Sequence, residues 1–284
     1  FTKGEKCMRY EVIPIIEKYL KDTLYHRDSN KTWENSFVAI QIQRRVNGEC
    51  FSTQDHIRAM VYAMLSSGNA WSRVTAVTDG RGNIPVVDEI FCQYDCKQLQ
   101  KVSCEQLHEK IKGIKCATQS TSAQMNVLFD NIHMLKEWEK VNGSIDEFYE
   151  KMIKIDSSMK ALISVLSTIG SPFKLKQMDV ALVCEYLRNV GFDLPKPDRH
   201  LRRILGKECL CFSEEDMVPP YEAIDIVTKI ACALSKPVAE VDYILWAYCA
   251  KEYGEVCTKK GQNCNTKCVV QNFCKKGGRC DETM

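Results

Sequence analysis

The stretch LRNVGFDLPKPDRHLRRILGK (residues 187–207) predicts the end of one helix, a stiff loop and the start of a second helix. The loop contains Pro195 and Pro197, and proline stops a helix because it fixes φ and lacks a backbone N–H. Asp198 follows directly, at the position where a helix N-terminus takes a capping side chain. Residues 199–206 read as a short, arginine-rich helix, so the stretch joins a carboxylate to a cationic helix.

Asp198 admits two interpretations, and the local sequence leaves both open. A helix N-terminus attracts anions, and nearby cations make it a good phosphate site. A carboxylate at such a place suits catalysis if the substrate develops positive charge beside it; otherwise Asp198 is a helix cap alone. The cations between positions 196 and 207 are Lys196, Arg199, Arg202, Arg203 and Lys207.

The preceding stretch, LSTIGSPFKLKQMDVALVCEYLRNVG (166–191), predicts two helices joined by a turn that contains Gly170. Backbone N–H groups that are exposed at such a turn can hold a DNA phosphate without reading the base sequence. We expect Lys174 and Lys176 to add positive charge there. The alternative is an ordinary pair of antiparallel helices that binds no ligand.

Helical periodicity covers most of the rest of the chain, and strand signals are sparse. Ser103 and Ser144 stand where helix N-caps are expected. Only FVAIQIQRRVN (37–47) alternates briefly between apolar and polar residues, which predicts a short hairpin or an irregular stretch. We predict an all-α fold of about ten helices with a cysteine-bearing C-terminal loop. The expected helices cover residues 10–24, 55–67, 104–112, 123–141, 145–154, 157–170, 176–191, 199–206, 221–234 and 239–254.

The composition suits a globular chain, with 284 residues of which 45% are hydrophobic and 27% charged. Because the net charge is only +2, a nucleic-acid surface must come from local patches. No apolar run reaches the roughly 20 residues of a membrane span, and no secretory signal is visible, so we expect no membrane partner. Many of the 16 cysteines lie in apolar helical patterns, as buried thiols do. We expect a mainly reduced, intracellular protein, in a bacterial or archaeal cytoplasm or in a nucleus.

The stretch CTKKGQNCNTKCVVQNFC (257–274) holds four cysteines with six, three and five residues between them. A disulfide interpretation requires an oxidising compartment, for which the chain gives no other sign. Four inert thiols are also unexpected in so polar a loop. Coordination is favoured, because four thiolates can hold zinc or a 4Fe–4S cluster. The predicted ligands are Cys257, Cys264, Cys268 and Cys274.

The order of these pieces resembles the helix-hairpin-helix DNA glycosylases. ALVCEYLRNVGFDLPKPDRHLRR (181–203) looks like the segment that carries the catalytic aspartate in archaeal-type 8-oxoguanine glycosylases. The tail from residue 243 to 274 looks like the 4Fe–4S loop of endonuclease III and the adenine-mismatch glycosylases, whose usual spacing is six, two and five. IRAMVYAMLSSGNAWSRV (57–74) resembles the first helix and turn of their helical barrel. The resemblance covers roughly residues 55 to 275.

The resemblance implies two helical domains with a DNA-binding cleft between them. Residues 55–190 would form a six-helix barrel with the hairpin, and residues 191–284 the cluster-bearing domain, against which residues 1–54 would pack. Such a protein is a base-excision repair enzyme, expected as a monomer. It flips a damaged or mispaired base out of double-stranded DNA and cleaves its N-glycosidic bond. Asp198 would stabilise the cationic sugar. The residues expected to contact DNA are Asn69, Ile169, Gly170, Lys174, Lys176, Arg199 and Arg202.

Two departures from the family pattern limit this expectation. About seven extra residues lie between the hairpin turn and Val180, and Asp179 occupies the position of the lysine that bifunctional members use as nucleophile. We therefore expect a monofunctional glycosylase or a member that has lost catalysis. Two alternatives are a non-catalytic DNA-binding protein on the same fold and a zinc-stabilised helical interaction module. Cys249 and Cys280 are further thiols that could replace a ligand, since the extra residue between Cys264 and Cys268 alters the spacing.

Overall fold

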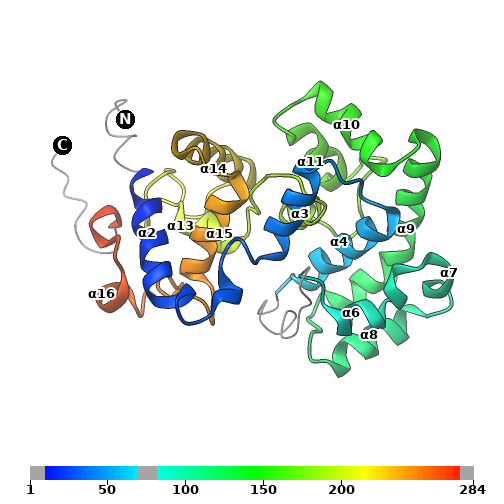
Figure 1. Cartoon of the computed structure of the whole chain (residues 1–284), viewed down its shortest axis with the longest axis horizontal. Coiled ribbons are helices and arrows are strands. Elements are labelled where there is room, and N and C mark those ends of the chain that lie inside the picture. Colours follow the sequence, from blue (N-terminus) through cyan, green and yellow to red (C-terminus); the bar gives the residue numbers. More distant parts are fainter. Residues whose placement is uncertain (1–9, 69–81, 276–284) are drawn as a thin grey trace. The chain divides into compact units, whose positions relative to one another are not determined.

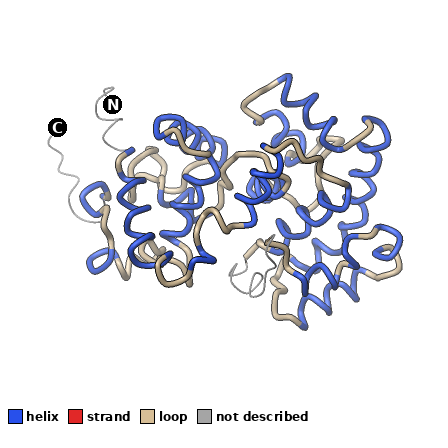
Figure 2. Tube along the Cα trace, viewed as in Figure 1, coloured by secondary structure: helices blue, strands red, loops and turns tan. Residues whose placement is uncertain are grey.

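The computed structural model describes residues 10–68 and 82–275, and these ranges consist of helices and loops without a strand (Figure 2). The predicted all-α fold is confirmed. The chain divides into two compact units. One contains the N-terminal segment up to Ala39 and the chain from Asp193 onward, and the other runs from Ile40 to Phe192. The N-terminal segment of the first unit is thus shorter than the 54 residues that we expected.

The first unit is built around one hydrophobic core that joins both ends of the chain (Figure 1). Helix α2 packs against α15, which also packs against α13 and α14. Ile13 and Ile16 from α2 share this core with Leu201, Ile204 and Leu245. The unit contains α2 (Val12–Leu20) with a π-helical turn (Lys21–Tyr25), α13 (Arg199–Ile204), α14 (Pro220–Leu234), α15 (Val238–Cys249) and α16 (Cys264–Lys267), with 3-10 turns at Ser29–Lys31 and Gln271–Phe273.

The second unit places α4 and α12 at its centre, and these two helices make its most extensive contact. Around them, α9 packs against α4, α8 and α10, while α11 packs against α10 and α12. The unit contains most of α3 (Phe37–Val46), then α4 (Thr53–Leu65), α6 (Pro85–Ile90), a 3-10 turn (Cys92–Tyr94), α7 (Cys96–Leu99), α8 (Cys104–Gly113), α9 (Thr121–Asn142), α10 (Ile145–Ile155), α11 (Lys160–Ser167) and α12 (Val180–Asn189).

Local sequence signals account for many helix ends. Ser103 accepts a hydrogen bond from the Gln106 N–H and Ser144 from the Glu147 N–H, so both predicted caps are confirmed. The prediction for residues 37–47 is wrong, because this stretch forms helix α3. Its buried residues Phe37 and Gln41 lie four positions apart, on one helical face. The brief alternation therefore concealed a helical period.

A buried polar network crosses the second unit. The Nδ1 atom of His56 lies 2.7 Å from the hydroxyl of Tyr186, which is 2.8 Å from that of Tyr149. On its other side, Nε2 of His56 lies 3.3 Å from Oδ1 of Asp146, and Arg45 donates to the same oxygen at 2.8 Å. Burial lowers the pKa of His56 below its ordinary value, although Asp146 acts in the opposite direction. The histidine is therefore neutral in the folded protein at neutral pH.

The lowered pKa of His56 predicts how the stability of the protein depends on pH. Below the ordinary histidine pKa of 6.5, the unfolded chain binds a proton at His56 that the folded protein resists. Its stabilising contribution is thus complete above that pH and decreases as the pH falls toward the lowered folded pKa. We expect the free energy of unfolding to fall by up to about 1.4 kcal/mol per pH unit in this window.

Denaturant unfolding between about pH 7 and pH 5 measures this effect. His56→Gln is the matched variant, and its slope should be smaller than that of the wild type. A residual slope is expected in the variant, because burial also lowers the pKa of His200. Equal slopes for the two proteins would show that His56 is not the responsible group.

Candidate functional site

Asp198 is the N-cap of α13. Its Oδ1 accepts hydrogen bonds from the N–H groups of His200 at 2.7 Å and Leu201 at 3.1 Å. The other carboxylate oxygen, Oδ2, takes part in neither bond. The side chain is half-buried, and Pro195 and Pro197 before it are buried, so the loop holds the carboxylate in place. Capping and a second role through Oδ2 are therefore compatible.

The same loop carries a second aspartate with a different task. Asp193 accepts from the Ala239 N–H through Oδ1 at 2.8 Å and from the Val238 N–H through Oδ2 at 3.0 Å. Both of its oxygens thus hold the start of α15. Asp198 uses only one oxygen for its helix, and it is therefore the better candidate for chemistry.

The arginines of α13 differ in their surroundings. Arg199 is exposed, whereas Arg202 donates through Nε to the carbonyl of Val218 at 2.6 Å. Arg203 donates to the carbonyl of Cys257 at 2.7 Å, which ties α13 to the first cysteine of the C-terminal loop. Arg199 is the member of this set best placed to meet a phosphate. Arg202, which we expected at the DNA, holds the chain after α13.

The turn between α11 and α12 presents an exposed tip. The Ser171 N–H donates to the Thr168 carbonyl at 3.2 Å, and Gly170 adopts φ = 92° between them. Glycine is favoured at such a position because other residues rarely adopt positive φ. Ile169 is 89% exposed, and Gly170 has no atom within 4 Å of where a Cβ would lie. The N–H groups of these two residues lie outside the bond that closes the turn.

The residues after the tip, from 171 to 178, form a packed part of the hairpin. Leu175 and Met178 are buried, and the Phe173 ring lies 5.3 Å from the ring of Phe148. Buried Asn131 of α9 fixes the backbone of Lys176 in both directions, since it accepts from the N–H at 2.8 Å and donates to the carbonyl at 3.0 Å. The insertion therefore holds the tip at a defined place on α9 and α10.

Lys174 closes the hairpin from within. Its ammonium donates to the carbonyls of Ser167 at 2.8 Å and Met178 at 2.7 Å, and more weakly to Leu175 at 3.4 Å. Burial lowers its pKa, while the charge of Asp179 acts in the opposite direction. The ammonium thus bridges the end of α11 and the start of α12. This internal role differs from the DNA contact that we expected.

Lys176 and Asp179 lie on the exposed side of the hairpin. The ammonium of Lys176 pairs with Asp130 of α9 at 2.8 Å, and both side chains are more than half exposed. Such a surface pair contributes little to stability, so Lys176 can exchange Asp130 for a phosphate at small cost. Asp179 caps α12 by accepting from the Leu182 N–H at 2.9 Å. Asp179 is therefore a helix cap.

The four cysteines of the C-terminal loop line one cavity in the first unit. Cys257, Cys264, Cys268 and Cys274 are joined there by Cys209, and the other lining residues are Ile204, Leu210, Tyr248, Thr258 and Val270. The hydrogen bond with Cys209 lowers the pKa of the Cys257 thiol, but the Cys249 thiol beside it and burial together outweigh this effect, so the pKa lies well above its ordinary value. Thiols facing one largely apolar space are the donor type that an iron–sulfur cluster takes. They fit a single zinc ion less well, because no three of them are arranged to hold one ion in the part of the chain that the structure describes.

The extra residue between Cys264 and Cys268 falls in the one-turn helix α16 (Cys264–Lys267). In the loop that this stretch resembles, the corresponding cysteines are three positions apart, whereas Cys264 and Cys268 are four positions apart. Both separations bring side chains to the same face of a helical turn. The local structure therefore accommodates the altered spacing, and both thiols remain at the cavity.

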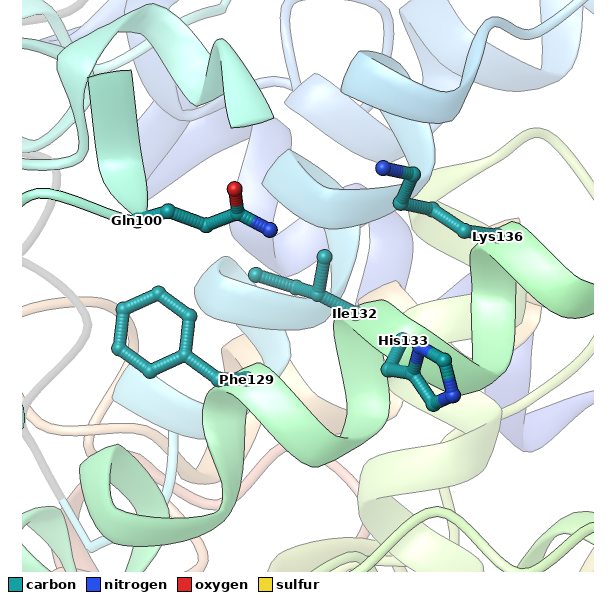
Figure 3. Close-up of a pocket in the computed structure, with 5 residues that line it drawn as sticks. All are labelled: Gln100, Phe129, Ile132, His133 and Lys136. Atoms are coloured by element: carbon teal, nitrogen blue, oxygen red, sulfur yellow. The ribbon is translucent and has the colours of Figure 1, made fainter. Parts of the chain in front are cut away.

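A further pocket of about 210 Å³ lies on α9, with one wall from Gln100 after α7 (Figure 3). It is lined by Gln100, Phe129, Ile132, His133 and Lys136, none of which we predicted as a site residue.

Within residues 10–68 and 82–275, no group of three or more His, Cys, Asp or Glu side chains is arranged to hold a single metal ion. No helix in the same ranges is long and apolar enough to cross a membrane.

Asn69 and Cys280 lie outside the described residues. Sequence reasoning missed Cys209 and the internal role of Lys174. No spacing rule connects Cys209 to a loop some fifty residues later. The one local signal was the nearby Cys211, which makes that segment rich in cysteine. Lys174 looked like any cation of a polar turn.

Comparison with known proteins supplies no relative. No protein-family model matches the chain, and no curated protein and no solved structure matches it either. The residues and their geometry are therefore what bears on the function.

Proposed function

We propose that this protein is a DNA N-glycosylase that removes a damaged or mispaired base. The observation that carries the proposal is Asp198, a half-buried carboxylate held by one oxygen at the start of a cationic helix. The order of hairpin, PKPDRH loop and four-cysteine loop, which resembles the helix-hairpin-helix glycosylases, supports it. Release of free base from a lesion-bearing duplex tests it.

The chemistry requires a carboxylate of this kind. As the bond from C1′ of deoxyribose to the base nitrogen breaks, the sugar develops oxocarbenium character. A carboxylate near C1′ stabilises that cation and orients the attacking water, which gives its hydroxyl to C1′. The base leaves with the electron pair of the broken bond, and the proton of the water passes through solvent to the base nitrogen. Oδ2 of Asp198 is the oxygen that we assign to this role. The products are the free base and an abasic site.

Duplex DNA hides the bond, so the base must first be flipped out of the stack, at a cost of a few kcal/mol. Contacts with phosphates can offset this cost. We assign such contacts to the exposed hairpin tip at Ile169 and Gly170 and to Lys176 in the second unit, and to Arg199 in the first. We keep Asn69 as the residue that would fill the vacated stack, as the resemblance implies.

The cysteine loop would hold a 4Fe–4S cluster, with zinc as the alternative. Thiol donors suit both groups chemically, but the resemblance in spacing supports the cluster, and the described residues contain no group of three or more ligands arranged for one ion. When bound, the group would supply no step of the hydrolysis and would fix the loop. The exposed lysines Lys259, Lys260, Lys267 and Lys275 could then approach the DNA backbone.

Two observations favour a monofunctional enzyme over one with lyase activity. Asp179 caps α12 where bifunctional relatives of this pattern carry a nucleophilic lysine. The two hairpin lysines are engaged elsewhere, since Lys174 donates to hairpin carbonyls and Lys176 pairs with Asp130. The same observations also suit a DNA-binding protein without catalysis, which is the second candidate. The base-release experiment separates the glycosylase from the DNA-binding protein without catalysis. If the protein does not bind DNA at all, the remaining candidate is a zinc-stabilised helical interaction module.

The two hairpin lysines should affect DNA binding in different ways. Lys176→Met removes a surface cation, so we expect the slope of log affinity against log salt to fall by about one. Lys174→Met removes the internal bridge between α11 and α12. We expect it to weaken binding while leaving that slope unchanged, because no phosphate contact is lost. Titration of a fluorescent duplex at several salt concentrations measures both.

Asp130→Asn is the matched control, since it frees Lys176 from its ion pair and should leave binding equal or tighter. If Lys174→Met lowers the salt slope as Lys176→Met does, Lys174 contacts phosphate directly and its assigned role is wrong. An unchanged affinity for both variants would exclude the hairpin as a DNA contact.

A further inference from the structure

A fifth thiol faces the cavity of the cysteine loop. Cys209 belongs to the turn after α13, about fifty residues before the loop, and is only 4% exposed. It lines the same cavity as the four predicted ligands and is hydrogen-bonded to the thiol of Cys257. The cavity therefore presents five sulfur donors, whereas zinc or a 4Fe–4S cluster takes four from the protein.

The backbone holds Cys209 at this place. Its N–H donates to the Gly206 carbonyl at 3.0 Å, and its carbonyl accepts from the Lys275 N–H at 3.3 Å. The turn is thus bonded directly to the residue that follows Cys274, the last cysteine of the loop. Cys209 is positioned by the fold and does not depend on a flexible segment.

The other extra thiols are less well placed. Cys249 is hydrogen-bonded to Cys257 but does not line the cavity. The Cys211 thiol donates to the carbonyl of Lys207 at 2.8 Å. Of the spare ligands that the sequence offers, Cys280 lies outside the described residues. Cys209 is therefore the additional donor that the described structure favours.

Cys264 is the ligand that we expect Cys209 to replace. Cys257 and Cys268 pack against the hydrophobic core of the first unit, and Cys274 is buried. Cys264 is half-exposed on the one-turn helix α16, outside that core. It is also next to the altered spacing. Its bond to a metal is thus the one least supported by surrounding packing.

We propose that Cys209 is a reserve metal ligand that takes the coordination position of Cys264. In the exchange, a metal held by the loop would lose its bond to the Cys264 sulfur and gain one to the Cys209 sulfur. The Cys209 thiol loses its proton to solvent, and the released Cys264 thiolate takes one up, so no oxidant or reductant is required. This inference rests on the proposed metal site and goes beyond it, since it predicts five functional thiols where four are needed.

Metal content tests the proposal without any activity assay. The full chain, purified without oxygen, is analysed for iron and zinc per chain and for absorbance near 400 nm. We expect Cys209→Ser and Cys264→Ser each to retain most of the wild-type metal. The double variant should lose it, falling about tenfold or more below either single variant. Cys232→Ser, at an exposed position on α14, is the control for the extra substitution when combined with Cys264→Ser.

Each outcome supports or overturns the proposal. If Cys264→Ser alone loses the metal, or if the double variant keeps as much as Cys264→Ser, Cys209 is not a reserve ligand. Wild-type protein without bound metal would overturn both the metal site and this inference. Circular dichroism confirms that each variant stays helical. Base release by the wild type is measured separately, so failure of the proposed enzyme activity remains distinguishable from failure of the ligand exchange.

Discussion

Asp198→Asn should lower the rate of base release by about 10² to 10⁴-fold while leaving the protein folded. Asparagine and aspartate are comparable N-caps, so the hydrogen bonds to the N–H groups of His200 and Leu201 can persist. What disappears is the negative charge that, in the proposed mechanism, stabilises the cationic sugar and orients water. Single-turnover kinetics on the best substrate and thermal unfolding of the same samples measure the two properties separately.

Asp193→Asn is the matched control, because Asp193 is an aspartate of the same loop that caps α15. It should keep the wild-type rate. Asp198→Ala should lose both activity and stability, the latter by about 1 kcal/mol, since alanine cannot cap α13. If Asp198→Asn retains the wild-type rate, the residue is a helix cap alone and the catalytic assignment is wrong.

Gly191→Ala should destabilise the protein by about 3 kcal/mol or more. Gly191 ends α12 with φ = 85°, and a Cβ there would lie 2.5 Å from the carbonyl oxygen of Gln41 and 2.9 Å from Cβ of Arg45. Backbone and side-chain atoms of α3 would have to move. Arg45 also donates to the Val190 carbonyl at 2.8 Å, so the displacement would disturb the buried network with Asp146. Denaturant unfolding measures the loss.

Gly48→Ala separates the steric effect from the backbone effect. Gly48 has a similar φ of 78°, but no atom lies within 4 Å of the place that an added Cβ would occupy. We expect a cost of only about 1–2 kcal/mol at this position. Equal losses for the two variants would mean that the close approach of α3 to Gly191 contributes nothing to stability.

The helices could be predicted largely from sequence, because their signals are local. Ser103, Ser144 and Asp198 cap the helices that follow them, as N-cap chemistry predicts. The prediction for residues 37–47 was wrong because apolar residues that are spaced for one helical face also alternate with polar ones over a few positions. Helix α3 then gains its burial from Phe37, Val38 and Gln41, which no local pattern distinguished.

The candidate site was harder to predict because its geometry depends on contacts between distant segments. Four cysteines in one loop indicated a common site, and in the structure they line one cavity. Cys209 joins them only through the path of the chain after α13. Similarly, Lys174 looked like a surface cation, but its ammonium reaches the Met178 carbonyl because the insertion folds back onto α9. Sequence showed which residue types were present, and folding determined which of them meet.

The most direct test of the proposed function is base release from a panel of duplexes, each carrying one damaged or mispaired base. Wild-type protein and Asp198→Asn are incubated with each duplex, and abasic sites are revealed by alkali cleavage of the strand. We predict that the wild type converts at least one duplex to an abasic product and that Asp198→Asn does so about 10² to 10⁴-fold more slowly. If both proteins leave every duplex intact while still binding DNA, the protein is not a glycosylase.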